Sequence, residues 1–219
     1  MIPSKFKYKL FGRFRGRKKF HHPSYEDLSR YRLKADKDIN KLNYNILDIG
    51  SGSGENALFL SKARPKSKII TCELFHDGNV NLVNQIINKK ITNICLFQGN
   101  VLEFFDCEEP LLIFDEIWIL FPDPWPKTRH HKRRLINNIF LANISRYLKH
   151  FGRLMIATDS QSYIQSIVKN IFLMQNIYIW NNQQVSEWSY GNLELPSTKF
   201  YKKAMKSSRN SMFFELHKI

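Results

Sequence analysis

The sequence lacks the features that mark secreted, metal-bound and membrane-spanning proteins. Its only cysteines, Cys72, Cys95 and Cys107, are odd in number and have no CxxC spacing, so we expect reduced thiols in a cytoplasmic protein. No run approaches the roughly 20 apolar residues of a membrane helix. The basic N-terminus has no apolar signal-peptide region. The pairs His21-His22 and His130-His131 have no carboxylate or cysteine at ligand spacing, so no metal is expected.

Acidic residues are also scarce, because 19 Asp and Glu face 34 Lys and Arg and leave a net charge of +15. The excess falls in three segments that contain no acid: residues 5–19 hold eight basic residues, 127–134 hold five and 199–209 hold five. The rest of the chain has 16 basic and 19 acidic residues. A genomic bias toward lysine would spread the charge, so its concentration favours a surface that binds a polyanion such as nucleic acid.

With 219 residues, of which 43% are hydrophobic, the chain is able to bury a core. Residues 1–23 are basic and aromatic with little periodicity, so we predict an arm, followed by a single domain over 24–219. Apolar strands are expected at 45–49, 68–74, 93–98, 116–121, 153–158, 177–180 and 212–216. Helices are expected at 24–40, 55–63, 79–90, 131–149 and 163–173.

This alternation of strands and helices predicts an α/β fold with a mostly parallel sheet covered on both faces. The last two strands are expected to close it as an antiparallel pair. In such folds ligands bind beyond the C-terminal ends of the strands, near the switch in strand order. Functional residues should therefore follow strands directly.

A glycine-rich loop over Asp48–Gly54 follows the first strand and permits close approach of backbone to a ligand. Glu73 ends the next strand, where a carboxylate accepts ribose hydroxyls. Glu55 stands where the NAD fingerprint wants a small residue, and no phosphate-binding lysine follows the loop. The GxGxG spacing instead resembles the S-adenosylmethionine site of class I methyltransferases. Asn100, after the third strand, is either an adenine contact or an ordinary turn residue.

A second motif, Phe121-Pro-Asp-Pro-Trp-Pro-Lys127, has alternate prolines and so predicts a stiff loop. Such a loop would hold Asp123 and Trp125 against a substrate. The basic run that follows, through Arg134, is expected at the start of the helix over 131–149. Positive charge there opposes the helix dipole, which favours a bound anion.

Two later segments carry weaker signals. Asp159 follows a strand, so it is expected either to contact the target base or to cap the next helix. Ser197–Tyr201, with the lysines after it, suits the phosphate and base of a nucleotide, although a solvated basic loop has the same composition.

In this order the motifs resemble the tRNA (guanine-N7-)-methyltransferase family, which is TrmB-like. The resemblance runs from the arm at Tyr8–Lys19 to the C-terminal strand. The FPDPWPK segment with the following RHHKRR is its most specific part, and LDIGSGSGE, Cys72-Glu73, ATD at Ala157–Asp159 and the late TKF support it. It implies a Rossmann-like class I methyltransferase with a mostly parallel seven-stranded sheet and helices on both faces.

The resemblance further implies that the chain transfers a methyl group from S-adenosylmethionine to N7 of a guanine in the tRNA variable loop, at position 46 of the tRNA. The positions that match cofactor contacts are Asp48, Gly50, Gly52, Glu73, Asn100 and Asp123. Asp123 also matches the residue usually assigned as catalytic. The positions that match substrate contacts are Lys127, Arg129, Lys132, Arg133, Arg134, Asp159, Thr198, Lys199, Phe200 and Tyr201.

Two positions depart from the family pattern: the family usually has glutamate where Asp48 stands and glutamate where Tyr201 stands. Asp159 is then the remaining carboxylate for the guanine, or activity is reduced. The alternatives are an amino-methyltransferase, whose (Asp/Asn)-Pro-Pro-aromatic loop differs from the order at 123–126, and a tRNA-binding protein with reduced catalysis. We expect tRNA as partner, with no membrane and no metal, and leave monomer and homodimer open.

Overall fold

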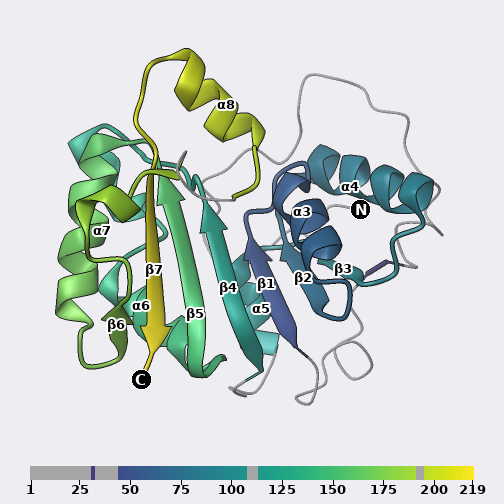
Figure 1. Cartoon of the computed structure of the whole chain (residues 1–219), viewed down its shortest axis with the longest axis horizontal. Helices are drawn as coiled ribbons and strands as arrows, with labels where there is room; N and C mark the ends of the chain where they lie inside the picture. The colour runs from purple at the N-terminus through teal and green to yellow at the C-terminus, as the bar shows by residue number, and fades with distance from the viewer. Residues whose placement is uncertain (1–30, 33–43, 108–112, 191–194) are drawn as a thin grey trace.

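The computed structural model describes residues 31–32, 44–107, 113–190 and 195–219, and one sheet runs through it (Figure 1). The strands are β1 (Asn45–Ile49), β2 (Lys68–Cys72), β3 (Ile94–Phe97), β4 (Phe114–Leu120), β5 (Leu148–Thr158), β6 (Tyr178–Trp180) and β7 (Met212–Lys218). Their order across the sheet is β3-β2-β1-β4-β5-β7-β6. Strand β7 is antiparallel to both its neighbours, and the other pairs are parallel.

The strand order reverses between β1 and β4, which are hydrogen-bonded neighbours although two strands separate them in the chain. Asp48 pairs with Trp118 there, and Ile49 pairs with Ile119. This switch point leaves a crevice at the C-terminal ends of the two strands, which is where ligands bind in open α/β sheets.

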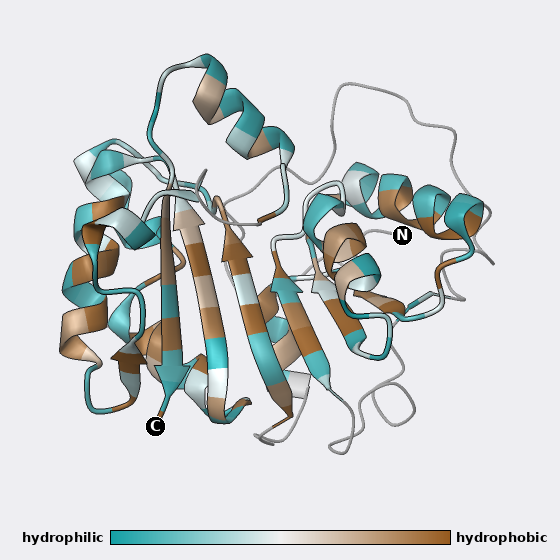
Figure 2. Ribbon diagram, viewed as in Figure 1, coloured by the Kyte–Doolittle hydropathy of each residue, from teal (hydrophilic) through white to brown (hydrophobic). Residues whose placement is uncertain are grey.

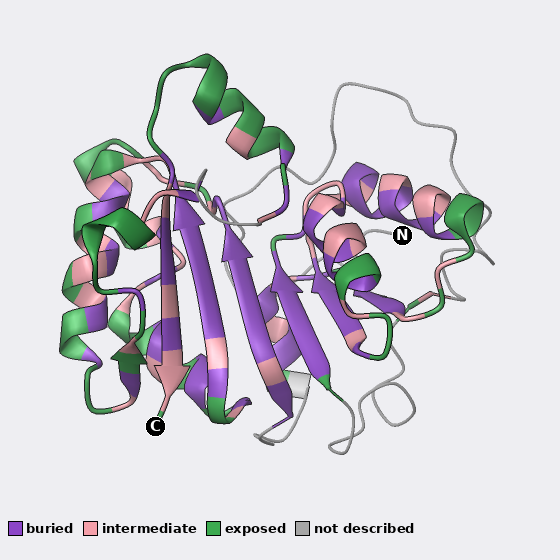
Figure 3. Ribbon diagram, in the orientation of Figure 1, coloured by how far each residue is buried: buried purple, intermediate pink, exposed green. Residues whose placement is uncertain are grey.

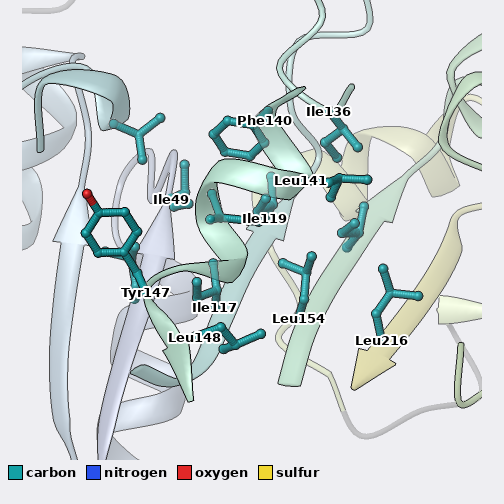
Figure 4. Packing of buried hydrophobic residues seen from close by; sticks show 14 of the residues in the cluster. Ile49, Ile117, Ile119, Ile136, Phe140, Leu141, Tyr147, Leu148, Leu154 and Leu216 are labelled. Carbon is teal, nitrogen blue, oxygen red and sulfur yellow. The ribbon is translucent and has the colours of Figure 1, made fainter. Parts of the chain in front are cut away.

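Helices pack on both faces of the sheet because the central strands are apolar on both sides. The helices are α3 (Glu55–Ala63), α4 (His76–Lys89), α5 (Val101–Cys107), α6 (Asn138–Ser145), α7 (Gln161–Leu173) and α8 (Lys199–Lys206), with 3-10 turns η1 (Thr128–Arg133) and η2 (Val185–Glu187). One core packs α5, α6 and α7 against the sheet, and Figure 4 shows part of it around Phe140 and Leu141. A second core packs α3 and α4 against the other face. The strands are accordingly buried along most of their length (Figure 3).

The first four strands and helix α3 lie close to their predicted ranges. Strand β1 and helix α3 have the predicted bounds, and strands β2, β3 and β4 differ by at most two residues at each end. The closing strands, β6 and β7, form the expected antiparallel pair. The seven-stranded, mostly parallel sheet with helices on both faces is confirmed.

The long helix predicted over 131–149 is wrong. The chain forms η1, continues in an extended conformation at Arg134, and begins α6 only after Asn137, whose side chain accepts a hydrogen bond from the Phe140 N–H at 3.0 Å. Strand β5 already starts at Leu148. The basic run therefore does not lie at a helix N-terminus, and the inference of a bound anion from the helix dipole loses its basis.

Helices α5 and α8 were not predicted, and residues 199–206 are helical rather than a solvated loop. The arm at 1–23 lies outside the described residues. So does the helix expected over 24–40, apart from Tyr31 and Arg32, where an isolated parallel bridge joins Arg32 to Leu96. In the part of the chain that the structure describes, no helix has the length and apolar character needed to span a membrane.

Candidate active site

The glycine-rich loop after β1 is held in a tight, left-handed path. Gly50, Gly52 and Gly54 all have positive φ angles, between 58° and 85°, which disfavour other residues. The Gly52 N–H donates to Glu73 Oε2 at 2.7 Å, so the carboxylate that ends β2 fixes the loop. At the start of α4, a Cβ on Gly78 would lie 2.1 Å from the Gly52 carbonyl oxygen, so the helix approaches the loop as closely as glycine allows.

A pocket opens over this loop at the switch point. Its lining comes from β1, the loop, the first turn of α3, the end of β4 and the start of α8: Asp48, Gly50, Ser51, Gly52, Glu55, Asn56, Leu120, Thr198 and Phe200. Three buried oxygen atoms of this lining have no hydrogen-bond partner: Asp48 Oδ2, Ser51 Oγ and Asn56 Oδ1. The pocket therefore suits a ligand that brings hydrogen-bond donors.

Two buried carboxylates near the pocket, Asp48 and Glu73, have raised pKa values. Asp48 is almost fully buried, and its Oδ1 accepts a hydrogen bond from Asn56 Nδ2 at 2.8 Å. Burial raises the pKa of Asp48 to about 7, and the nearby carboxylates of Glu73 and Glu55 add to the shift. Burial also raises the pKa of Glu73, against the lowering effect of its backbone hydrogen bonds and of Lys199. A cationic ligand would relieve both groups.

Asn100 serves a local structural purpose. Its Oδ1 accepts from the Leu102 N–H at 3.0 Å, and its N–H donates to Glu103 Oε2 at 3.2 Å, as expected for a residue that caps the start of α5. It lies beside Gly99, whose N–H donates to the Glu73 carbonyl at 3.2 Å. The structure thus places Asn100 next to the end of β2 but not among the residues that line the pocket.

The start of α8 covers the pocket. Thr198 is buried and caps α8, since its Oγ1 accepts from the Tyr201 N–H at 3.1 Å. The Lys199 ammonium donates to Ser53 Oγ in the glycine loop at 2.9 Å and lies 5.2 Å from the centre of the Phe200 ring. Segments 146 residues apart in the chain therefore meet over the pocket. The sequence predicted these residues as site residues but did not predict helix α8, whose first turn they form.

The proline loop after β4 has a strained backbone. Phe121 and Trp125 have φ angles of 54° and 44°, in the left-handed region that such bulky residues rarely adopt. Strain of this kind persists only where the surroundings impose it, and it is concentrated at functional sites. Asp123 is exposed between them, and partial desolvation of its carboxylate raises its pKa above the ordinary aspartate value.

The basic run after the loop divides into two groups. Lys127, Arg129 and Lys132 are exposed, whereas Arg133 stacks on Trp125, with 5.0 Å between the guanidinium carbon and the ring centre. His130 approaches the same ring edge-on at 5.9 Å. Desolvation and the surrounding cations lower the pKa of His130. Arg134 is buried and turned inward.

Asp159 and Tyr201 have protein partners. Asp159 Oδ2 accepts from Arg209 Nε at 2.7 Å, and Ser160 rather than Asp159 is the N-cap of α7, so the capping interpretation of Asp159 is wrong. Tyr201 packs against Tyr190 at 4.6 Å between ring centres and against Phe121 at 6.5 Å. The position where the family has glutamate is thus part of an aromatic cluster that supports the proline loop.

Comparison with known proteins decides the family. A family model described as "Putative methyltransferase" matches residues 43–214. The tRNA (guanine-N(7)-)-methyltransferase of Wolbachia pipientis wMel is 30% identical over 216 residues, which cover 96% of this chain and 94% of the relative. The enzyme of the same name from Neorickettsia sennetsu is 32% identical over 163 residues, which cover 73% of each chain. The chain belongs to the tRNA (guanine-N(7)-)-methyltransferase family.

The resemblance read from the sequence motifs is thereby confirmed. The solved structure of the aminoglycoside resistance methyltransferase NpmB1 has a TM-score of 0.58 at 14% identity, covers 84% of this chain and 91% of its own, and shows the same fold. The expected site residues fall into two sets in this fold. The glycine loop and the start of α8 line the pocket, and Glu73 is hydrogen-bonded to that loop, while the proline loop and η1 follow β4, whose end also lines the pocket. No group of three or more potential metal ligands occurs in the described ranges.

Proposed function

We infer that this member of the tRNA (guanine-N7-)-methyltransferase family methylates N7 of a guanine in the tRNA variable loop, with S-adenosylmethionine as donor. The observation that carries the inference is the pocket at the switch point between β1 and β4. Asp48 lines this pocket with one buried oxygen that has no hydrogen-bond partner. The strained proline loop and the exposed cations of η1 follow β4, whose end also lines the pocket. Because tRNA is the substrate, we place the reaction in the cytoplasm.

The residues of the pocket fit this cofactor. Its ammonium and ribose hydroxyls are donors, and the unpartnered atoms of Asp48, Ser51 and Asn56 are oxygens able to accept. S-adenosylmethionine supplies a methyl group on a sulfonium, which is a good leaving group. We propose that Asp48, Gly50, Gly52, Glu73, Asn100 and Asp123 hold it.

The chain needs no general base, because guanine N7 carries an exposed lone pair. Its task is to align the base with the methyl group and to stabilise the positive charge that the base gains. Two observations support this role for a carboxylate: Asp123 lies on the strained loop after β4, and Asp159 follows β5. A carboxylate there is worth more in the transition state than in the ground state, so Asp123 is the proposed catalytic residue.

The substrate side of the site combines exposed cations with the start of α8. We propose that Lys127, Arg129, Lys132 and Arg133 contact tRNA phosphates, which the positive charge of η1 attracts. The proposed contacts to the target nucleotide are Asp159, Thr198, Lys199, Phe200 and Tyr201. For Tyr201 the aromatic packing supports a stacking or supporting role, not the carboxylate contact of the family's glutamate.

The test is to incubate the purified protein with S-adenosylmethionine and unmodified tRNA transcripts, and to identify the product nucleoside by mass spectrometry. We expect 7-methylguanosine, and Asp123→Ala should lower turnover far more than tRNA affinity. A methyl group on an exocyclic amine would indicate an amino-methyltransferase. Absence of both methylation and cofactor binding would indicate a tRNA-binding protein without catalysis.

A further inference from the structure

Arg134 differs from every other basic residue of its run. Only 6% of its surface is exposed, whereas Lys127, Arg129 and Lys132 are exposed. Its guanidinium makes three hydrogen bonds within the protein. Nε donates to the Pro124 carbonyl oxygen at 2.9 Å, Nη1 to the Ser162 carbonyl oxygen at 3.0 Å, and Nη2 to Ser162 Oγ at 2.8 Å. The planar group thus joins the proline loop to the first turn of α7.

The α7 side of this connection is rigid. The Arg134 guanidinium lies over the ring of Tyr163, with 4.9 Å between its carbon and the ring centre. Tyr163 is fully buried in the core beneath, and its hydroxyl oxygen accepts from the Ile136 N–H at 2.9 Å. Arg134 is therefore fixed on two sides by a helix that is itself anchored in the core.

The loop side needs such an anchor. Pro124 lies between Asp123 and Trp125, and proline has no N–H, so its carbonyl is the backbone group through which it can be held. Phe121 and Trp125 on either side are in the strained left-handed region. Strain of roughly 1–3 kcal/mol per residue must be imposed by neighbours.

We propose that Arg134 is a positioning residue that fixes the proline loop, and with it the Asp123 carboxylate, rather than a contact to tRNA phosphate. The catalytic part of this proposal rests on the proposed function, because it assumes that Asp123 acts on the methyl transfer. The structural part, that Arg134 holds the loop, stands on the contacts alone. A phosphate contact would require Arg134 to leave three hydrogen bonds and a buried site.

Two substitutions separate the two roles. Arg134→Gln removes the charge: a positioning residue leaves the salt dependence of tRNA affinity unchanged, whereas a phosphate contact lowers the log–log slope by roughly 0.7 to 0.9. Arg134→Lys keeps the charge but loses the planar fork. We expect both substitutions to lower the single-turnover rate of methylation at saturating tRNA roughly ten- to a hundredfold, because the loop is misplaced. The charge that Arg134→Lys keeps should therefore not preserve the wild-type rate.

Ser162→Ala and Lys132→Gln are the matched variants. Ser162→Ala removes one of the three bonds without changing any charge, so it should lower the saturated rate in the same direction as Arg134→Lys but less. The effects of these two substitutions should not add in the double variant, since both act on one connection. Lys132→Gln, at a proposed phosphate contact, should flatten the salt slope, whereas Lys62→Gln, which is exposed in the last turn of α3, should change neither the slope nor the saturated rate.

Hydrogen exchange of the free protein gives a readout that does not depend on activity. Peptides that span residues 121–134 should exchange faster in Arg134→Lys and Arg134→Gln than in the wild type, and at the wild-type rate in Lys132→Gln. Unchanged exchange in both Arg134 variants overturns the proposal, as does wild-type methylation by Arg134→Lys. If the wild type forms no 7-methylguanosine, the proposed function fails, and the exchange result still decides whether Arg134 holds the loop.

Discussion

Two carboxylates at the ends of neighbouring strands do different work at the residue scale. Both oxygens of Glu73 accept from backbone N–H groups at 2.7 Å, one from Gly52 and one from Phe75. Asp48 uses one oxygen for Asn56 and has the other unpartnered. Glu73 therefore shapes the glycine loop in addition to its proposed contact with the cofactor, while Asp48 lines the pocket with a carboxylate that burial has made costly to ionise.

The first prediction follows from the double role of Glu73. Glu73→Ala should weaken S-adenosylmethionine binding by roughly 1.5–3 kcal/mol, the range for a hydrogen bond to a charged group. Calorimetric titration measures this, and tRNA affinity should change little. Glu187→Ala, which removes a carboxylate that accepts from the Gln184 N–H on η2, is the control and should leave cofactor binding intact. Equal affinities of Glu73→Ala and wild type would contradict the assignment.

The second prediction concerns the pH dependence of stability. The folded pKa of Asp48, about 7, lies above the ordinary value of about 3.9, so the folded protein binds the proton more tightly than the unfolded chain. The stability that this contributes is fully present below about pH 4 and is lost as the pH rises through 7. Asp48→Asn cannot titrate and removes this dependence.

Denaturant unfolding of both proteins without ligand, at pH 5 and pH 8, provides the measurement. The free energy of unfolding of the wild type, taken relative to Asp48→Asn, should fall by about 2–3 kcal/mol between these two pH values. If the difference between the two proteins stays constant across this range, Asp48 is ionised in the folded state at pH 5, and the argument from its burial is wrong.

At the element scale, strands and helices were predicted correctly where the local residue pattern was clear. The run NILDI and the glycine loop after it predicted β1 and the start of α3, because an apolar strand and a helix with an apolar face each have their own periodicity. The helix over 131–149 failed because apolar residues from η1, an extended connection, α6 and the start of β5 happen to fall near helical spacing. Asn137, the N-cap, was the overlooked signal.

The candidate site shows the same division. Asp48 near the end of β1, Glu73 directly after β2 and the proline loop directly after β4 were predicted from sequence, because the switch-point rule places residues at the C-terminal ends of strands together. The burial of Arg134, the pairing of Asp159 with Arg209 and the reach of Lys199 to Ser53 depend on tertiary packing between distant segments. Helix α8 was missed because of its residues only Ala204 is buried, so its apolar pattern is short.

The third prediction tests how α8 supports the loop. Restoring the family residue with Tyr201→Glu should lower stability by roughly 1–3 kcal/mol and should not raise turnover. The reason is that it places a carboxylate against the Tyr190 and Phe121 rings, which support the proline loop. Tyr201→Phe keeps the packing and should stay within about 0.5 kcal/mol. Thermal unfolding and methylation rates measure both, and faster turnover by Tyr201→Glu would show that the glutamate contact remains accessible in this chain.

At the scale of the whole molecule, the two ends of the parallel strands differ in how their charged side chains are partnered. Toward the N-terminal ends of the strands the acids are paired: Asp115 with Lys149 at 2.8 Å, and fully buried Glu116 with Arg64 at 3.0 Å and with Arg153. At the opposite end, to which the arrowheads of β4 and β5 point, α8 is mostly hydrophilic (Figure 2). The exposed cations there include Lys127, Arg129, Lys132, Lys199, Lys202, Lys203 and Lys206.

The last prediction uses this asymmetry. Arg129→Gln with Lys132→Gln removes two exposed cations beside the proline loop. It should lower the log–log salt slope of tRNA affinity by roughly 1.4–1.8, since each lost phosphate contact lowers it by roughly 0.7 to 0.9. Deletion of residues 1–19, which lie outside the described residues, removes eight basic residues and should flatten the slope at least as much. That deletion should spare the rate at saturating tRNA, because we expect the arm to bind RNA away from the target base.

Lys62→Gln with Lys89→Gln is the matched control, since both residues are exposed in the last turns of α3 and α4, away from the pocket. It removes the same charge and should leave the slope unchanged, which separates local contact from a loss of net charge. If this control flattens the slope as much as the Arg129 and Lys132 variant does, tRNA is attracted by the net charge of +15 and not by the cations beside the proline loop in particular. If arm deletion abolishes the saturated rate while the protein stays folded, the arm belongs to the active site, because a distant clamp affects only how tightly tRNA is held.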